Sequence, residues 1–327
     1  MVNNGLIVAN VSQLALVLDP PNVADAFVNS SAGILRASNG GILQLTANGG
    51  GDLRNNGVFE VLDGSTISLA AYTLSNFSDG ILTGGTYRVL SAGAPTTLDF
   101  GFGSIAANAA TIELQGADSA FPQLAGLAAN QGSLKIAGGR NFLTSGALLN
   151  TGKIEIGANS TLSISGNFAS TAASTITGSG KITANFLNLA GIIAPGNSPG
   201  TISFEGDVEL FPSTRLVFEL GAPLGIHDQL SIDGSLKLDG SLEVSALPGF
   251  GVGEYQLATY SGTLADFVLD FSSMPGGYDY QIRTVTPGQV VLSVAVPEPS
   301  GLLLSLLGAL QALSRRNRSV SRQKIRS

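Results

Sequence analysis

Residues 196–200 (Gly-Asn-Ser-Pro-Gly) have the pattern G-x-S-x-G, which places the serine nucleophile of many hydrolases on a sharp turn. In such a site, the backbone N–H of the residue after the serine stabilises the oxyanion that forms in the reaction. Here that residue is Pro199, which has no backbone N–H. The base would have to be His227, the sole histidine of the chain. We therefore interpret this segment as a turn and predict no nucleophilic catalysis.

The remaining polar residues give weak signals for catalysis or metal binding. His227 and Asp228 are adjacent and could form a dyad, although a single histidine in a loop is more often structural. Asp228, Asp233 and Asp239 stand at the ends of short apolar runs, where carboxylates can bind Ca²⁺ or remain solvated. The chain has no cysteine, which excludes a cysteine-based zinc site. We predict no cofactor, no metal and no enzymatic activity.

The composition favours a β-rich stack of closely packed turns. Charged residues make up 12% of the chain, about half the usual share, and 43 residues are glycine. Residues 1–296 carry 10 Lys/Arg and 22 Asp/Glu, a net charge of −12, whereas residues 297–327 carry 6 and 1, a net charge of +5. The acidic body would repel phosphates, so we expect no nucleic-acid partner.

The elements that must position these side chains are short strands. Apolar and small polar residues alternate in Gly41–Leu45, Gly132–Ile136 and Gly240–Val244, a period of two that indicates β-strands. The pairs Asn39-Gly40, Asn48-Gly49 and Asp63-Gly64 could be hairpin turns, which leaves an antiparallel β-sandwich as an alternative.

Internal repeats favour a β-solenoid over that alternative. Residues 53–68 and 148–163 share their pattern over 16 positions without a gap, and Glu60 and Glu155 are equivalent in it. We expect both glutamates to point outward and not to form a carboxylate pair. Stacked coils bury their inward residues only against each other, and asparagines at corners can bond to the coils on either side. We assign 1–32 to N-terminal coils or a cap, 33–245 to solenoid repeats and 246–294 to terminal coils and a cap.

The body resembles the autotransporter-passenger-like β-helical repeats of large bacterial surface proteins. The resemblance is carried by Ala194–Thr201, by Asp228–Leu230 and by Leu82–Tyr87. It implies an all-β fold, a single-stranded right-handed parallel β-helix, and no particular activity.

The C-terminal tail, residues 295–327, has three parts in a fixed order. The motif Val296, Pro297, Glu298, Pro299, Ser300 is followed by an uncharged apolar segment, which begins at Gly301 and contains Leu302, Leu303, Leu304, Leu306, Leu307, Leu310 and Leu313, and then by Arg315, Arg316 and Arg318. This order resembles the PEP-CTERM sorting signal of Gram-negative bacteria. The resemblance implies a short membrane helix held in the inner membrane and cleavage near the motif by an exosortase-type enzyme.

The chemistry of the tail agrees with this interpretation. Two prolines keep the motif extended and accessible, and arginines hold their end of an apolar segment on the cytoplasmic side. The apolar segment is 13 residues long, shorter than the roughly 20 of an ordinary span. Met1–Pro20 contains no Lys or Arg and lacks the features of an export signal, so we expect a misplaced start or a fragment of a longer protein.

Three functions are compatible with these features. The first is an exported structural or adhesive protein of the cell surface or extracellular matrix, whose partner is an extracellular polysaccharide or a copy of itself. The second is a β-helical polysaccharide lyase or hydrolase, for which the sparse basic residues and the absence of Trp are unfavourable. The third is an autotransporter passenger, which would need a C-terminal barrel instead of an arginine-rich tail. We favour the first.

Overall fold

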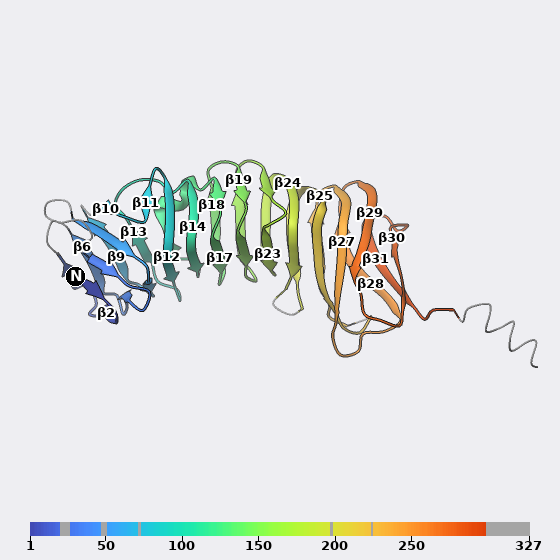
Figure 1. Cartoon of the computed structure of the whole chain (residues 1–327), viewed down its shortest axis with the longest axis horizontal. Coiled ribbons are helices and arrows are strands. Elements are labelled where there is room, and N and C mark those ends of the chain that lie inside the picture. Colours follow the sequence, from blue (N-terminus) through green and yellow to red (C-terminus); the bar gives the residue numbers. More distant parts are fainter. Residues whose placement is uncertain (20–26, 47–50, 71–72, 197–198, 224, 299–327) are drawn as a thin grey trace, which may run out of the picture.

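The computed structural model describes residues 1–19, 27–46, 51–70, 73–196, 199–223 and 225–298. They form an elongated all-β rod, a β-solenoid of about ten turns, with 62% of residues in strands (Figure 1). The parallel β-solenoid expected from the repeats is confirmed, and the parallel pairing of nearly all strands excludes the antiparallel sandwich. The expected C-terminal helix lies outside the described residues.

Each coil contributes to three rows of stacked strands. The first, the asparagine row, contains β1 (Val2–Asn3), β4 (Phe27–Asn29), β7 (Asp52–Asn55), β10 (Thr73–Leu74), β16 (Ala129–Asn130), β19 (Leu148–Asn150) and β22 (Phe168–Ser170). The second, the charged row, contains β2 (Leu6–Ala9), β5 (Ile34–Ala37), β8 (Val58–Leu62), β17 (Ser133–Ala137), β20 (Lys153–Ile156) and β23 (Thr175–Gly178). The third row contains β3 (Ala15–Leu18), β6 (Ile42–Thr46), β9 (Thr66–Ala70), β13 (Thr96–Asp99), β15 (Ser119–Ala120), β18 (Asn141–Thr144), β21 (Thr161–Ile164) and β26 (Gln229–Asp233).

Longer strands continue from one row into the next. They are β12 (Ile81–Leu90), β14 (Ala107–Gln115), β24 (Lys181–Pro195), β25 (Thr201–Leu220), β27 (Leu236–Ala246) and β29 (Leu264–Ser273). The segments Gly234–Leu238 and Gly240–Val244, similar in sequence, therefore occupy adjacent rows of one coil, mostly within β27. A small strand, β11 (Phe77–Ser78), pairs antiparallel with β12, and a 3-10 helix, η1 (Pro122–Gly126), follows β15.

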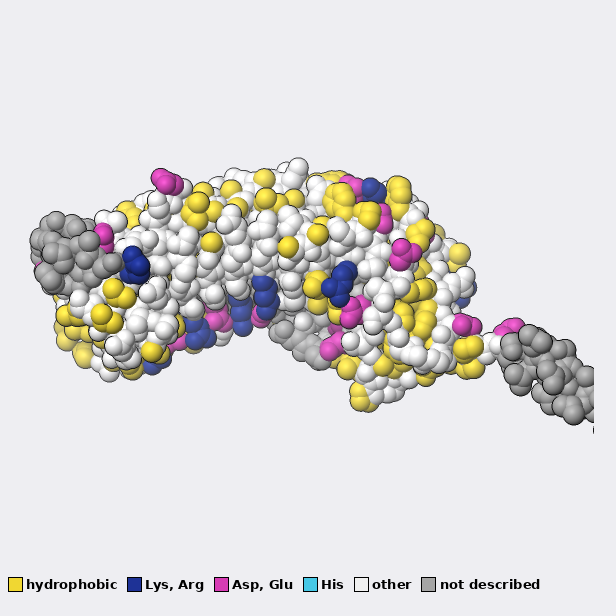
Figure 2. All heavy atoms as spheres, in the orientation of Figure 1, with side chains coloured by type: hydrophobic (Ala, Val, Ile, Leu, Met, Phe, Trp, Pro, Cys, Tyr) yellow, Lys and Arg dark blue, Asp and Glu magenta, His cyan; other side chains and the backbone are white. Residues whose placement is uncertain are grey.

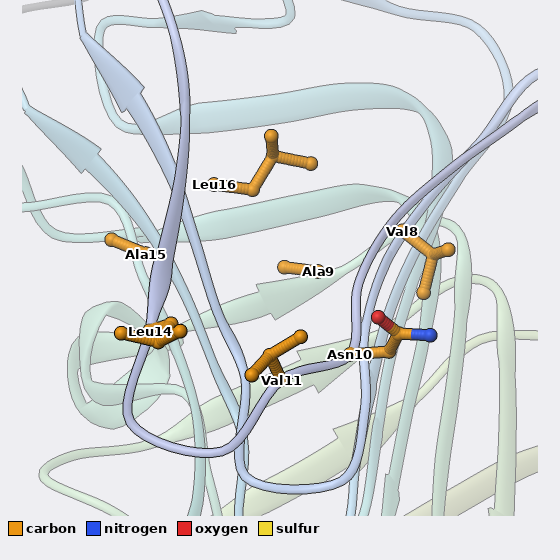
Figure 3. A pocket seen from close by; sticks show the side chains of 7 residues that line it. All are labelled: Val8, Ala9, Asn10, Val11, Leu14, Ala15 and Leu16. Carbon is orange, nitrogen blue, oxygen red and sulfur yellow. The ribbon is translucent and has the colours of Figure 1, made fainter.

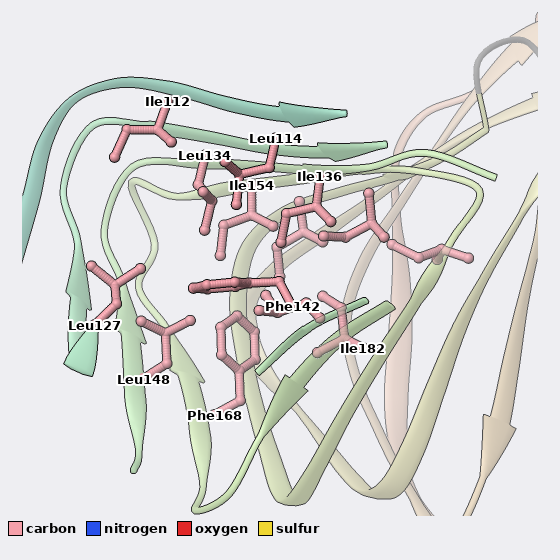
Figure 4. Close-up of a cluster of buried hydrophobic side chains, with 14 of the residues drawn as sticks. Ile112, Leu114, Leu127, Leu134, Ile136, Phe142, Leu148, Ile154, Phe168 and Ile182 are labelled. Atoms are coloured by element: carbon pink, nitrogen blue, oxygen red, sulfur yellow. The ribbon is translucent and has the colours of Figure 1, made fainter. Parts of the chain in front are cut away.

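Inward side chains stack in register along the rod. In the charged row, Leu35 pairs with Phe59, and the column continues through buried Tyr87, Ile112, Leu134, Ile154, Ile176, Ile193, Leu216 and Leu242. Figure 4 shows part of this core, with Phe142 and Phe168 packed from the other rows. Alternation with a period of two thus places every second residue in the core and the others on the outer surface of the rod.

Asparagines form buried ladders at one corner, as the sequence predicted. The Asn3 side-chain amide donates to Asn29, and Asn29 donates to Asn55, each at 2.8 Å. The same arrangement recurs at Asn108, Asn130 and Asn150. Each ladder pairs polar groups that the stacking has removed from water and fixes the register between coils, although the Nδ2 of its last residue, Asn55 or Asn150, has no hydrogen-bond partner among the described residues.

Two of the three predicted hairpin signals turn the chain between rows, and the third, Asn48-Gly49, lies outside the described residues. Asn39 and Gly40 both have positive φ, 54° and 73°, and join β5 to β6, while Asp63 and Gly64 join β8 to β9. These pairs therefore supply tight corners of coils.

At the C-terminal end of the solenoid, strand pairing changes from parallel to antiparallel. β28 (Gly253–Tyr260) pairs parallel with β26 on one side and antiparallel with β31 (Gln289–Ala295) on the other. β30 (Asp279–Arg283) then pairs antiparallel with β31. Buried Leu292 and Val294 of β31 join the core, so this antiparallel sheet closes part of the C-terminal end.

Candidate functional site

The outer surface of the charged row carries alternating charges. Arg36, Glu60, Arg88, Glu113, Lys135 and Glu155 occupy successive strands in one register. Ion pairs link each neighbour to the next: Arg36 Nε to Glu60 at 2.6 Å, Arg88 to Glu60 at 3.1 Å and to Glu113 at 2.8 Å, and Lys135 to Glu113 at 3.3 Å and to Glu155 at 3.4 Å. Figure 2 shows basic and acidic side chains side by side along the lower edge of the rod.

The glutamate side chains of this charge ladder are more buried than its arginine and lysine side chains. The side chains of Glu60, Glu113 and Glu155 are 9%, 14% and 20% exposed, whereas those of Arg88 and Lys135 are both 38% exposed. Burial alone would raise the pKa of Glu155, but its bonds to Lys153 and Lys135 hold that pKa below its usual range. As expected, Glu60 and Glu155 do not form a pair, since three other members of the ladder lie between them.

The ladder stops at Glu155, and a hollow follows. The next outward positions are Thr177, Ala194 and Val217, none of which is charged. They form part of an open hollow of about 370 Å³, which is also lined by Lys153, Glu155, Pro195, Gly196, Glu219, Asp228 and Ser245. Small residues in place of long charged ones leave this depression in the outer surface of the charged row.

Asp228 secures the wall of the hollow. Its carboxylate accepts the backbone N–H groups of Gly200 and Glu219, both at 2.7 Å. Burial raises the pKa of Asp228 to about 6, and these two N–H bonds oppose the rise. Since both oxygens are engaged by the backbone, Asp228 ties Gly200 to Glu219 of β25.

His227 is structural. Its Nδ1 lies 3.0 Å from the carbonyl oxygen of Gly225, and its Nε2 lies 3.2 Å from the carbonyl oxygen of Gln256. No bond to Asp228 is among its contacts in the described part of the chain, so the adjacent pair does not form a dyad there. Ser198 of the G-x-S-x-G segment lies outside the described residues.

The three aspartates considered for Ca²⁺ serve separate corners. Asp233 accepts the hydroxyl of Ser261 at 2.8 Å, and Asp239 accepts the N–H of Gly240 at 2.7 Å. Within the described ranges, no three acidic, His or Cys side chains gather as a metal site would require.

A second hollow, of about 280 Å³, lies at the N-terminal coil between β2 and β3 (Figure 3). Leu16 pairs with Leu43, which is fully buried, yet Leu16 is 37% exposed because no coil covers it in the described chain. Leu14 and Val17 are also exposed, and residues 2–18 contain no charged side chain.

The predicted sorting motif directly follows the last strand. Val296, Pro297 and Glu298 come after β31 and are exposed. Pro299, Ser300, the apolar segment and the arginines lie outside the described residues. Within the described residues, no helix has the length and hydrophobicity to span a bilayer.

The charge ladder was missed by the sequence analysis, apart from Glu60 and Glu155. A signal was present, since each member occupies the same place in its strand and the sign alternates from coil to coil. Aligning the strands coil by coil would have revealed this alternation. The uneven number of residues per coil obscures that alignment in the sequence.

Comparisons with known proteins give one partial similarity. No family model matches the chain. A stretch of 109 residues, 31% of the chain, is 34% identical to the adhesin BmaC autotransporter of Brucella suis biovar 1 (strain 1330). The match covers 3% of that protein's length. Together with the solenoid, it fits β-helical repeats of the autotransporter-passenger type.

Proposed function

We propose that the protein is an exported structural and adhesive component of the cell surface or extracellular matrix. The observation that carries this proposal is the rod itself, a long solenoid whose partial similarity is to an adhesin. A rod with an internally satisfied core displays its outer rows over a large distance and keeps them in fixed register. Such a surface suits repeated contacts with a polymer or with another surface.

We further propose that residues 296–318 sort the protein in the manner of a PEP-CTERM signal. Pro297 and Pro299 would hold the motif extended for an exosortase-type enzyme while the apolar segment rests in the inner membrane. The exposure of Val296 to Glu298 beyond β31 supports access by such an enzyme. Cleavage there would release the complete solenoid to the surface.

The alternative of a glycan-cleaving enzyme has less support. Such an enzyme needs an acid and a base free to exchange protons with the substrate. In the hollow, both oxygens of Asp228 accept backbone N–H groups, and Glu155 is bonded to Lys153 and Lys135, so Glu219 is the one lining carboxylate without such bonds in the described part of the chain, and an acid and base pair is lacking there. Binding without turnover is therefore the activity we propose.

Copies of the protein are a second candidate partner. The body carries a net charge of −12, which drives copies apart along their flanks, whereas the coil over residues 2–18 is uncharged and exposes Leu14, Leu16 and Val17. Analytical ultracentrifugation of the full chain and of Leu16→Lys tests this pairing. Concentration-dependent dimers that the substitution abolishes would support it, and a monomer at all concentrations would refute it.

The sorting proposal is tested in the native host. The double variant Pro297→Ala with Glu298→Ala should remain in the inner-membrane fraction, while the wild-type chain reaches the surface and is cut by protease added to whole cells. Glu205→Gln, on the solenoid, is the control and should behave like the wild type. Equal surface exposure of all three chains would contradict sorting by the motif.

A further inference from the structure

The floor of the hollow beside the charge ladder is formed by uncharged residues, unlike the outer surface of the preceding coils. Ala194 and Val217 supply apolar surface, and Thr177 supplies a hydroxyl. Outward positions on the preceding coils are filled by Arg88, Glu113 and their neighbours. A volume of about 370 Å³ falls within the range of pockets that bind small ligands.

The wall of the hollow carries uncompensated negative charge. Glu219 points outward from β25, between buried Phe218 and Leu220, and no ion pair to it occurs within the described residues. Asp228 is adjacent, and its carboxylate is likewise without a cationic partner in the described part of the chain. Lys153, on the opposite side, is already paired with Glu155 at 3.0 Å. The site therefore favours a ligand that brings its own positive charge.

The lining of the hollow includes both polar and apolar groups that can contact a sugar. Hydroxyls of Thr177 and Ser245 can exchange hydrogen bonds with ligand hydroxyls, while Ala194 and Val217 can contact the C–H face of a sugar ring. The net charge of −12 on the body adds a long-range attraction for a cationic polymer and opposes an anionic one.

We propose that this hollow binds an amino sugar unit of an extracellular polysaccharide, with its free ammonium group against Glu219 and its ring over Ala194 and Val217. The inference names a ligand for the proposed adhesive function and rests on it. The binding itself is a property of the purified chain and does not depend on how the protein is sorted.

The experiment uses the purified full-length chain and two matched probes. Chitosan oligosaccharides carry free amines, and fully N-acetylated chito-oligosaccharides of the same length carry none. Isothermal titration calorimetry should show binding of the amine form, weakening as salt is raised, and at least tenfold weaker binding of the acetylated form.

Two variants and a control locate the site. Glu219→Gln removes the charge with little change of shape and should weaken binding of the amine form on the order of tenfold. Thr177→Arg places a cation on the outward floor and should abolish binding. Glu205→Gln removes an equal charge from the third row, where Glu205 is paired with Lys181, and should bind like the wild type.

Any of three results would overturn the inference. Equal affinity for both probes would remove the role of the ammonium group, and equal weakening by Glu219→Gln and Glu205→Gln would reduce the effect to overall charge. Absence of binding to either probe would also refute the site. The proposed surface localisation is tested separately, by fractionation of the host.

Discussion

The carboxylate of Glu60 lies between two guanidinium groups from the coils on either side, Arg36 at 2.6 Å and Arg88 at 3.1 Å. The three residues come from β5, β8 and β12, which are consecutive strands of the charged row. Ion pairs of this kind connect neighbouring coils in only one register, because a slip by one residue would place the charges in the core. The ladder thus specifies how coils stack as well as stabilising them.

Substitution of Glu60 should be costly because the carboxylate is nearly buried. Glu60→Gln leaves Arg36 and Arg88 facing each other, and we expect a loss of about 2 kcal/mol of folding stability. Thermal unfolding followed by circular dichroism provides the measurement. Glu205→Gln breaks an exposed pair and should cost less than about 0.5 kcal/mol. Equal shifts for the two variants would show that the ladder has no special role.

The asparagine ladder should be most sensitive at its centre. Asn130 accepts from Asn108 and donates to Asn150, both at 2.8 Å, and it also donates to the carbonyl oxygen of Lys153 at 3.0 Å, so Asn130→Ala removes these three hydrogen bonds from a buried position. We expect a destabilisation of about 3 kcal/mol. Asn141→Ala, at an exposed position on β18, is the control and should be near neutral. A neutral Asn130→Ala would mean that water replaces the ladder.

Two glycines of one coil should respond in opposite ways to alanine. A Cβ at Gly152 would lie 2.1 Å from the carbonyl oxygen of Gly132 on the preceding coil, so Gly152→Ala should cost about 1–3 kcal/mol. A Cβ at Gly146 meets no atom within 4 Å, and Gly146→Ala should be neutral or stabilise by up to about 1 kcal/mol. Comparable losses in unfolding experiments would contradict the close stacking of coils at Gly152.

Sequence reasoning succeeded where a pattern is repeated along the chain without a gap. The shared pattern of residues 53–68 and 148–163 predicted that Glu60 and Glu155 are equivalent, and both belong to the charge ladder. The partners of these glutamates could not be predicted, because Arg88 and Lys135 lie in coils whose spacing differs. The hollow was equally hidden, since it arises where Thr177 and its neighbours interrupt the ladder, and small residues in one strand give no signal alone.

Asp228 should make stability depend on pH. Burial raises its pKa to about 6 in the folded chain, so the folded state holds this proton more tightly than the unfolded state does. Its contribution to stability is therefore complete below the ordinary aspartate pKa and is lost as the pH rises through about 6.

Urea unfolding of the wild type and of Asp228→Asn between pH 4 and 7 isolates this effect. Because other carboxylates, such as Glu155 with its lowered pKa, contribute the opposite slope, the informative quantity is the difference between the two proteins. We expect the wild type to lose more stability, or gain less, than Asp228→Asn over this range. Parallel pH profiles would contradict a raised pKa.

The most direct test of surface sorting is mass spectrometry of the C-terminus of the protein recovered from the cell surface or matrix of its host. We predict that the recovered chain retains β31 and ends near Glu298, without the apolar segment and arginines. Recovery of a chain that retains its tail through Ser327 from the soluble interior of the cell would contradict the proposal.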